Sequence, residues 1–436
     1  MLAIQRLITA SAAELAGMIA RREASSVEVV RAHLERIDHV DPSVHAVVRI
    51  APDALDRARS ADEALARGEA VGPLHGVPFT VKDWIETADL ACDGGFPESR
   101  DRRPARDATA VARMRAAGAI LIGKTNVREG APLHPRPNNP RDPSRTPGSS
   151  SSGEAAIIAA GGSPMGLASD SGGSIRWPAH CCGVAGFKPS AGLVPSTGHF
   201  PRLGHLSDPR TVIGPMARSA GDLAAVLRAI AGEDFIDPGV TPVPLGLVAD
   251  VDVSGLRIGW FAAAVGAQVT ADTAHTVAAA ADALAAMGCA VSKIEAPWLE
   301  ESLAITRAYW ARRTSASLND WSPDRPARLD EAAIERSVFE WERFSRRMNA
   351  TMRDVDLLLS PVARRPAPAH GDWDETEYLF TLPYSLTGQP AAVIPFGVSA
   401  EGLPIAVQLA ARRWRDHHAL AAAVALEQSL SPAPAP

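Results

Sequence analysis

The chain has 436 residues and a formal net charge of −6, with 46% hydrophobic, 22% charged and 5% aromatic residues. These proportions are those of an ordinary globular protein. The acidic balance and the few aromatic side chains argue against a nucleic-acid or anionic-membrane partner, and no apolar run reaches the roughly 18–20 residues that span a bilayer.

Residues 11–70 are predicted to be helical throughout. Ser11 with Glu14, and Ser25 with Glu28, have the spacing of capping boxes, in which a serine begins the helix and a glutamate three residues on bonds back to it. The first residues lack the charged start, apolar core and cleavage site of a signal peptide. A cytoplasmic protein is therefore expected.

From residue 71 onward, short apolar strands alternate with helices. Strands are predicted at 76–83, 119–123, 164–170, 256–261, 355–361 and 391–397, and helices at 108–117, 155–160, 223–231, 270–287 and 418–430. Such alternation favours an α/β fold. We expect one large domain with a mixed, mostly parallel twisted sheet that helices cover on both faces.

Residues 118–125, GAILIGKT, match the letters of the phosphate-binding P-loop. That motif requires a flexible loop between a strand and a helix. Here the four middle residues are apolar and predict a buried strand, and no helix opening follows. Nucleotide binding is therefore not expected.

The chain has four cysteines and no C-x-x-C spacing for zinc. Adjacent cysteines do not readily bridge to each other, so free thiols in a reducing compartment are expected. The four are Cys92, Cys181, Cys182 and Cys289.

A candidate nucleophile follows the strand predicted at 164–170. Gly172 and Gly173 allow the backbone to turn sharply and to present consecutive N–H groups, as an oxyanion hole requires. Ser174 ends this turn, and a serine nucleophile needs a base.

The residues alone leave two candidates for the base that activates Ser174. His180, oriented by Asp170, would complete a Ser-His-Asp triad, although the G-x-S-x-G spacing of a nucleophile elbow is absent. Lys82 ends an apolar strand, where desolvation favours the neutral amine. The serine run 149–152 would then relay a proton between Lys82 and Ser174.

Several motifs in order resemble the amidase signature family. They are GVPFTVKD (76–83), GKTN (123–126), PGSSSSGEAA (147–156) and SDSGGSIRWPAHCCGVAGFKPS (169–190), followed by VDLLLSPVARRPAPA, TLPYSLTGQPAAVIPFG and EGLPIAVQLAARRWRD. The resemblance covers roughly residues 8–430. It implies one amidase domain, 1–430, with a helical N-terminal segment (1–70), a signature core (71–230) and a C-terminal part (231–430). The tail 431–436 is expected to be disordered.

Members of this family hydrolyse amides, and some hydrolyse esters or carbamates, with a Ser–cis-Ser–Lys triad. By resemblance Ser174 is the nucleophile, Ser150 is the cis relay serine and Lys82 is the base. Metal ions and organic cofactors are not implied. The oxyanion is assigned to the backbone N–H groups of Ser171, Gly172, Gly173 and Ser174, and supporting roles to Asp83, Asn126, Ser149, Asp170 and Arg176.

The chain departs from the family pattern in two places. Ser149 and Ser152 stand where the family has glycine, which costs about 1 kcal/mol each if φ is positive there. The loop 127–137 is shorter than usual, which predicts an open cleft. Pocket segments are expected at 131–137, 195–206, 305–320 and 373–389. Their candidate side chains are His199, Phe200, Trp310, Tyr378 and Tyr384. For each of these, ordinary packing without a role in the pocket is an equal alternative.

The leading functional interpretation is a stand-alone amidase or aryl acylamidase that also accepts esters and carbamates, as a urethanase does. Its partner is a small-molecule substrate, and the protein is expected as a monomer or homodimer. One alternative is the glutaminase-type subunit of a tRNA-dependent amidotransferase. A second alternative is a non-catalytic binding protein on the same fold.

Overall fold

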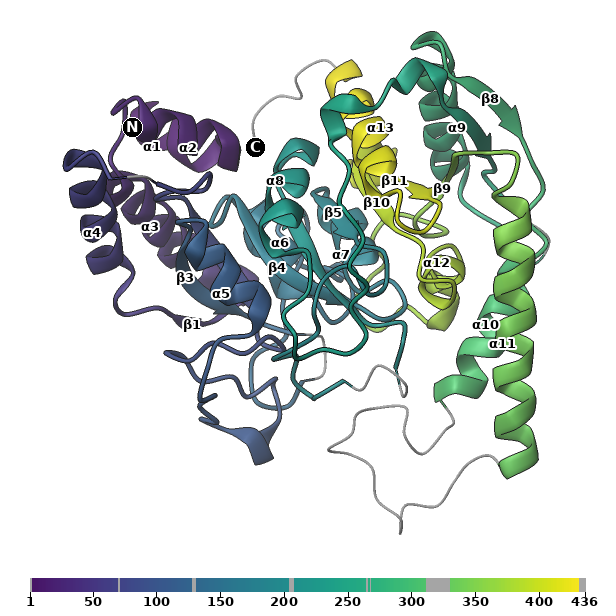
Figure 1. Ribbon diagram of the computed structural model, residues 1–436, viewed down its shortest axis with the longest axis horizontal. Coiled ribbons are helices and arrows are strands. Elements are labelled where there is room, and N and C mark those ends of the chain that lie inside the picture. Colours follow the sequence, from purple (N-terminus) through teal and green to yellow (C-terminus); the bar gives the residue numbers. More distant parts are fainter. Residues whose placement is uncertain are drawn as a thin grey trace.

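The computed structural model describes residues 2–69, 71–127, 131–203, 208–263, 266, 268–310 and 330–430. The described strands form one sheet in the order β1-β3-β2-β4-β6-β5-β10-β11-β9-β7-β8 (Figure 1). Their bounds are β1 Val47–Ile50, β2 Pro78–Lys82, β3 Ile120–Thr125, β4 Met165–Asp170, β5 Ala185–Lys188, β6 Val212–Ala217, β7 Arg257–Trp260, β8 Ala290–Lys293, β9 Leu357–Pro361, β10 Ala391–Val398 and β11 Pro404–Ala411.

The helices of the described residues flank this sheet. They are α1 Leu2–Thr9, α2 Ala12–Ala20, α3 Ser26–Val44, α4 Ala54–Ala66, α5 Thr109–Ala116, α6 Ser152–Ala159, α7 Arg176–Cys182, α8 Ala220–Ile230, α9 Ala271–Ala286, α10 Leu299–Trp310, α11 Glu331–Thr351, α12 Leu382–Leu386 and α13 Asp416–Ser429.

The α/β class and the mixed sheet are confirmed, but the expectation of mostly parallel pairing is wrong. Of the ten pairings between described strands, four are parallel and six antiparallel. Parallel pairs need a long crossover, whereas antiparallel strands can be joined directly. A short turn at 399–403 joins the antiparallel strands β10 and β11. The sequence prediction treated each helix as a crossover between parallel strands and so missed direct connections of this kind.

The N-terminal helices begin where the sequence predicts. Both capping boxes are present, at Ser11 with Glu14 and at Ser25 with Glu28. Uninterrupted helix over 11–70 is wrong, however, because Val47–Ile50 forms β1 and pairs with β3. The helix α3 ends one residue before the left-handed His45, and the β-branched residues that follow favour a strand.

The motif GAILIGKT contains strand β3, as predicted. Gly118 has φ +89 and follows helix α5, and Ile120–Thr125 is a fully buried strand. Lys124 lies inside this strand and donates to the Ile85 carbonyl. The segment is therefore part of the sheet and not a phosphate-binding loop.

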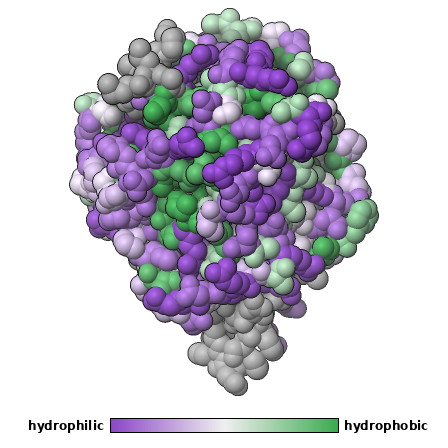
Figure 2. Space-filling model, turned by 90° about the vertical axis from the view of Figure 1, so that its left-hand side faces the viewer, coloured by the Kyte–Doolittle hydropathy of each residue, from purple (hydrophilic) through white to green (hydrophobic). Residues whose placement is uncertain are grey.

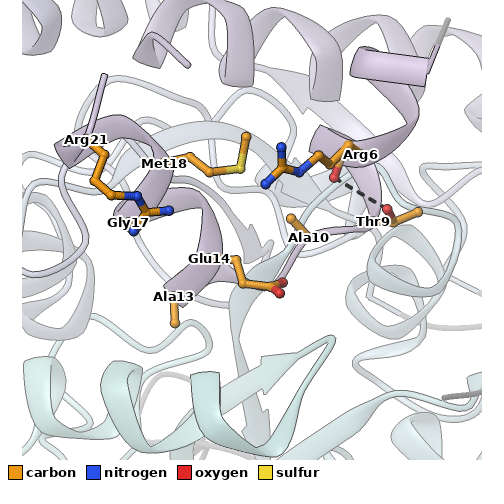
Figure 3. Close-up of a pocket in the computed structure, with 8 residues that line it drawn as sticks. All are labelled: Arg6, Thr9, Ala10, Ala13, Glu14, Gly17, Met18 and Arg21. Carbon is orange, nitrogen blue, oxygen red and sulfur yellow. Dashed lines mark hydrogen bonds between the residues drawn. The ribbon is translucent and has the colours of Figure 1, made fainter. Parts of the chain in front are cut away.

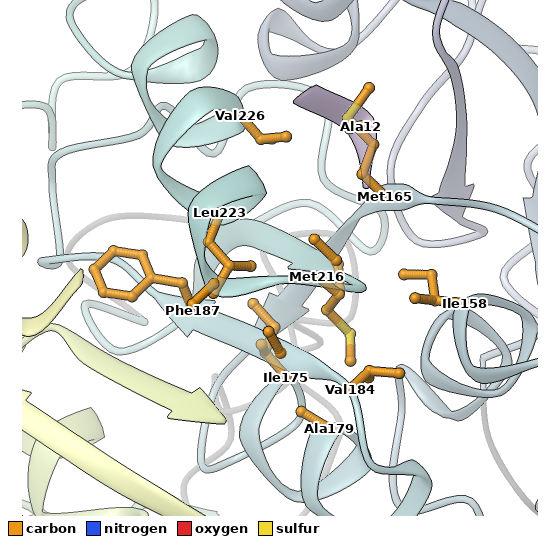
Figure 4. Packing of buried hydrophobic residues seen from close by; sticks show 14 of the residues in the cluster. Ala12, Ile158, Met165, Ile175, Ala179, Val184, Phe187, Met216, Leu223 and Val226 are labelled. Atoms are coloured by element: carbon orange, nitrogen blue, oxygen red, sulfur yellow. The ribbon is translucent and has the colours of Figure 1, made fainter. Parts of the chain in front are cut away.

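Helices cover both faces of the central strands. Figure 4 shows Leu223 and Val226 of α8 on one side of the sheet, and Ile175, just before α7, with Ala179 of α7 on the other. Phe187 of β5 packs beside them. The segment that leads from β4 into α7 therefore rests on a tightly packed core.

The surface over the N-terminal helices is mostly hydrophilic, with a narrow hydrophobic band near its centre (Figure 2). Among the described residues, none of the helices combines the length and the apolar character needed to cross a membrane. All four cysteines are free and buried, as the spacing predicts.

Candidate active site

Lys82 is the last residue of strand β2, and its side chain is fully buried. Its ammonium nitrogen Nζ lies 2.7 Å from Ser150 Oγ and 3.0 Å from Ser169 Oγ. Nζ also lies 4.3 Å from the centre of the Trp84 ring. Because β2 and β4 are parallel neighbours, their carboxyl ends meet at one edge, which brings Lys82 beside Ser169.

The serine run forms the turn that enters helix α6. Gly148 has φ +108, and a Cβ at this residue would lie 2.6 Å from Pro178 Cα, so the turn packs directly against α7. At the start of α6, Gly153 N donates to Asn126 O at 3.2 Å. These backbone contacts hold Ser150, which is 9% exposed, against Lys82.

The structure corrects one expectation about this turn. The peptide bond before Ser150 is trans, since the described residues hold a single cis peptide, Phe200–Pro201. A cis bond before a residue other than proline costs about 2.5–4 kcal/mol, which makes trans the default. The predicted cis-Ser150 is therefore wrong for this structure.

Ser149 and Ser152 fit the turn without backbone strain, because neither has a positive φ. The cost that the sequence attached to a left-handed serine does not arise. Both hydroxyls are buried and make no hydrogen bond with a described residue. Ser149 Oγ faces the Tyr378 hydroxyl without a hydrogen bond of normal geometry.

The loop 171–174 connects β4 to α7 and carries unused backbone donors. Gly173 has φ +142, which glycine adopts without strain. None of the four N–H groups of residues 171–174 donates to another described residue, whereas the next two, of Ile175 and Arg176, donate to Asp170 Oδ2. Four neighbouring free N–H groups are suited to hold an oxyanion.

Asp170 and Arg176 form a fully buried ion pair beneath this loop. Arg176 Nε and Nη2 each donate to the Asp170 carboxylate at 3.0 Å. Burial alone would raise the pKa of Asp170, but the charge and hydrogen bonds of Arg176 hold it below its ordinary value. Asp170 is thus a bound carboxylate that fixes the loop.

Ser174 lies on the loop and is partly exposed. Its hydroxyl makes no hydrogen bond with Lys82, Ser150 or any other described residue. The structure thus brings Lys82 and Ser150 into direct contact and leaves the Ser174 hydroxyl unengaged at the same end of the sheet.

The Ser-His-Asp alternative is wrong. His180 Nε2 bonds to the Arg365 carbonyl at 3.0 Å, and its Nδ1 accepts from Ala406 N at 3.1 Å. Burial lowers the pKa of His180 to about 4. Both ring nitrogens are therefore engaged, and Asp170 is bound to Arg176 instead.

Asp83 and Asn126 support the site through the backbone. Asp83 Oδ2 accepts from Gly94 N at 2.7 Å, and its other oxygen lies 3.6 Å from Lys124 Nζ. Burial raises the pKa of Asp83 to about 7. Asn126 Nδ2 donates to the carbonyls of His45 and Pro135.

Asp83, Asp93 and His134 place potential metal-ligand atoms within 4.8 Å of one another. The Asp93 carboxylate accepts from Arg49 at 2.7 Å and from His134 at 3.1 Å. Since Arg49 and Lys124 already neutralise the two carboxylates, the group is an ion-pair cluster.

Two of the predicted pocket residues, Trp310 and Tyr378, pack against the loop 171–174. A Cβ on Gly172 would lie 4.0 Å from Trp310 Cζ2, and one on Gly173 would lie 3.0 Å from Tyr378 Cδ1. Tyr384 instead packs in a buried hydrophobic cluster, which agrees with the alternative of ordinary packing. Residues 204–206 and 311–320 of the predicted pocket segments lie outside the described residues.

His199 and Ser169 join the network around Lys82. His199 Nε2 lies 3.0 Å from Ser169 Oγ. The sequence names His199 only as a pocket side chain and does not single out Ser169. Ser169 could have been found from its place near the end of a strand that runs parallel to the strand of Lys82. Recognising this requires the order of the strands in the sheet, which the sequence does not show.

Separate cavities lie elsewhere on the surface. One of about 610 Å³ lies between α1 and α2, and Figure 3 shows Arg6, Glu14, Met18 and Arg21 around it. It shares no residue with the predicted site. The expected open cleft stays a prediction, because residues 128–130 of the short loop lie outside the described residues.

The chain is similar over nearly its whole length to known amidases. The profile of the Amidase family matches residues 28–335 and 319–420. The AmiD protein of Mycobacterium tuberculosis is 36% identical over 95% of this chain and 93% of its own. A glutamyl-tRNA(Gln) amidotransferase subunit of Salinispora tropica is 32% identical over 98% of both chains.

Solved structures agree with the sequence relatives. The native peptide amidase of Stenotrophomonas maltophilia superimposes with a TM-score of 0.83 at 28% identity, over 96% of each chain. The chain therefore belongs to the amidase family of amidase signature enzymes, and it is an amide hydrolase.

Proposed function

We propose that this protein is a stand-alone hydrolase of amides and anilides in which Ser174 is the nucleophile, Ser150 the proton relay and Lys82 the base. The observation that carries the proposal is the buried hydrogen bond of 2.7 Å between Lys82 Nζ and Ser150 Oγ. The N–H groups of residues 171–174 support it, because they donate to no described residue, as donors to an oxyanion require.

In the first half of the reaction, the neutral amine of Lys82 accepts the Ser150 proton while Ser150 Oγ accepts that of Ser174. Ser174 Oγ bonds to the amide carbon, and the carbonyl oxygen becomes an oxyanion held by the loop N–H groups. Ser150 then gives a proton to the leaving nitrogen and regains one from Lys82, so the C–N bond breaks and acyl-Ser174 remains.

Water releases the acyl group through the same relay. It gives a proton to Ser150 as it attacks the ester carbon, and Ser174 leaves with a proton returned from Ser150. Both halves need Ser174 Oγ within hydrogen-bonding reach of Ser150 Oγ. Ser174 is partly exposed, and its hydroxyl has no competing partner among the described residues, which leaves it free to turn.

Aryl amides and carbamates are the substrates we propose, in line with the short loop 127–137 and its predicted open cleft. We place the enzyme in the cytoplasm as a monomer or homodimer, with residues 1–430 as one amidase domain and without a nucleic-acid or membrane partner.

The test is hydrolysis of a p-nitroanilide by the wild type and by Ser174→Ala, Ser150→Ala and Lys82→Met. Each variant is expected to lose about 10³-fold or more in kcat, because the three groups act as a unit. A serine-directed covalent probe should label Ser174 alone. Equal rates for wild type and Ser174→Ala would remove Ser174 from the mechanism.

The glutaminase-type subunit is the second candidate, and its support is the 98% mutual coverage with the Salinispora protein. The net charge of −6 and the short loop count against it. Glutaminase activity that appears only with copurified partner subunits, combined with no anilide hydrolysis by the chain alone, would favour it over the first proposal.

A further inference from the structure

We propose that His199 is a positioning residue that makes Ser150 the hydroxyl that donates its proton to Lys82, acting through Ser169. This inference rests on the proposed function, because it assumes that Lys82 works as a neutral amine. It explains why Lys82 contacts two serine hydroxyls, Ser150 and Ser169, although the reaction needs one relay.

The hydrogen bonds of His199 fix which ring nitrogen carries its proton. Nδ1 lies 2.9 Å from the carbonyl oxygen of Pro201, and Nε2 lies 3.0 Å from Ser169 Oγ. A carbonyl oxygen can only accept, so Nδ1 carries the hydrogen. In a neutral imidazole the other nitrogen is then an acceptor, and Nε2 accepts the hydroxyl hydrogen of Ser169.

The surroundings of the ring keep it neutral. Burial lowers the pKa of His199 to about 4, with the Pro201 carbonyl acting in the opposite direction. A protonated Lys82 would lower the pKa of His199 further, whereas Asp208 raises it. A neutral ring above pH 5 keeps Nε2 an acceptor throughout the range in which an enzyme of this kind is assayed.

The direction of the Ser169 hydroxyl follows from the histidine. Its one hydrogen points to His199 Nε2, so at Lys82 Nζ the Ser169 oxygen can only accept. Of the two hydroxyls in contact with Nζ, only that of Ser150 is able to donate. Between these two hydroxyls, only Ser150 can therefore give its proton to the lone pair of a neutral Lys82.

The backbone holds His199 next to the segment that follows Lys82. Residues Ile85 and His199 form an antiparallel bridge, and Phe200 N donates to Trp84 O at 2.7 Å. The Trp84 ring contacts the His199 ring edge-on, at 6.1 Å between centres, and carries Lys82 Nζ over its face. His199 and Lys82 are thus held together by the backbone contacts between residues 84–85 and residues 199–200.

Substitutions at His199 separate this role from packing. His199→Ala frees the Ser169 hydroxyl to donate to Lys82 in competition with Ser150. We expect kcat to fall about ten-fold, the effect of one misdirected hydrogen bond, with KM unchanged. His199→Gln keeps an acceptor near the position of Nε2 and is expected to restore most of the activity.

A double-mutant cycle adds a sharper readout. In a Ser169→Ala background there is no hydroxyl left to misdirect, so His199→Ala is expected to cause no further loss. His33→Ala is the matched control, because His33 is also fully buried but bonds within α3 to the Val29 carbonyl. Equal losses in His199→Ala and His199→Gln, or full additivity with Ser169→Ala, would overturn the proposal.

Nitrogen NMR of ¹⁵N-histidine-labelled wild type tests the tautomer without any substitution at the site. His199 should show a protonated Nδ1 and an unprotonated Nε2 from pH 5 to pH 8, with the signal assigned by its absence in His199→Gln. A protonated Nε2 in the wild type contradicts the proposal whatever the activities of the variants. Full activity of Lys82→Met would instead refute the proposed function, which keeps the two failures distinct.

Discussion

At the scale of single residues, Glu154 is a buried ionisable group beside the site. It is fully buried in the first turn of α6 and accepts hydrogen bonds from the hydroxyls of Thr80 and Thr125. Burial raises the pKa of Glu154 to about 7, against the opposing effect of these hydrogen bonds and of Lys124 and Lys82. The carboxyl therefore takes up its charge only near neutral pH.

This shift predicts a pH-dependent effect of Glu154→Gln on stability. The folded pKa lies above the unfolded value of 4.5, so the contribution of Glu154 is fully present below pH 4.5 and is lost as the pH rises through 7. The glutamine variant lacks this loss. Urea unfolding at pH 5, 6, 7 and 8 should show its stability rising relative to the wild type, and a constant difference would contradict the raised pKa.

At the scale of elements, close backbone packing at the start of α6 sets the position of Ser150, the proposed relay. A Cβ on Gly153 would lie 2.6 Å from Asn126 N, Asn126 O and Ala46 O. The helix thus meets the ends of β1 and β3 at a distance that only glycine allows. Ser150 lies in the turn directly before this contact.

Gly153→Ala is therefore expected to destabilise the protein by several kcal/mol and to lower activity, because backbone atoms cannot move aside cheaply. The matched control is Gly221→Ala, at the same second position of α8, where the nearest atom to the new Cβ is 3.9 Å away. That variant should be neutral or more stable by about 0.5–1 kcal/mol. Thermal unfolding and anilide hydrolysis of both variants measure the contrast.

At the scale of the whole molecule, Arg176 joins segments that are far apart in sequence. Besides Asp170, its Nη1 donates to Thr381 O at 2.8 Å and to Gln408 Oε1 at 3.0 Å. Strands β5 and β10 pair directly, so the sheet itself is also continuous between these parts. The loop 171–174, the proposed oxyanion hole, is therefore held by contacts with its own segment and with the C-terminal part of the chain.

Arg176→Met leaves the Asp170 carboxylate buried without its partner. We expect a loss of about 3–5 kcal/mol in the free energy of unfolding, as for other broken buried ion pairs. Arg346→Met is the control, since its ion pair with Glu342 is solvent-exposed and should matter little. Denaturant unfolding of both variants provides the comparison, and a small loss at Arg176 would contradict the assigned role.

The sequence alone determined the local features of this protein. Apolar periodicity and capping boxes placed the helices that begin after Ser11 and Ser25 and most of the strands, and the order of motifs indicated the amidase family. Apolar middle residues were enough to reject the P-loop at 118–125. These features depend on interactions between residues that are close in the sequence, so they can be predicted from the sequence alone.

The tertiary structure decided what depends on strand order and on contacts over long separations. Strand β1, the antiparallel majority of pairings and the trans bond before Ser150 all departed from expectation. The contact of Lys82 with Ser169, and through it with His199, exists only because β2 lies beside β4 and residue 199 pairs with residue 85. Such pairings are fixed by the packing of the whole sheet, which no short stretch of sequence encodes.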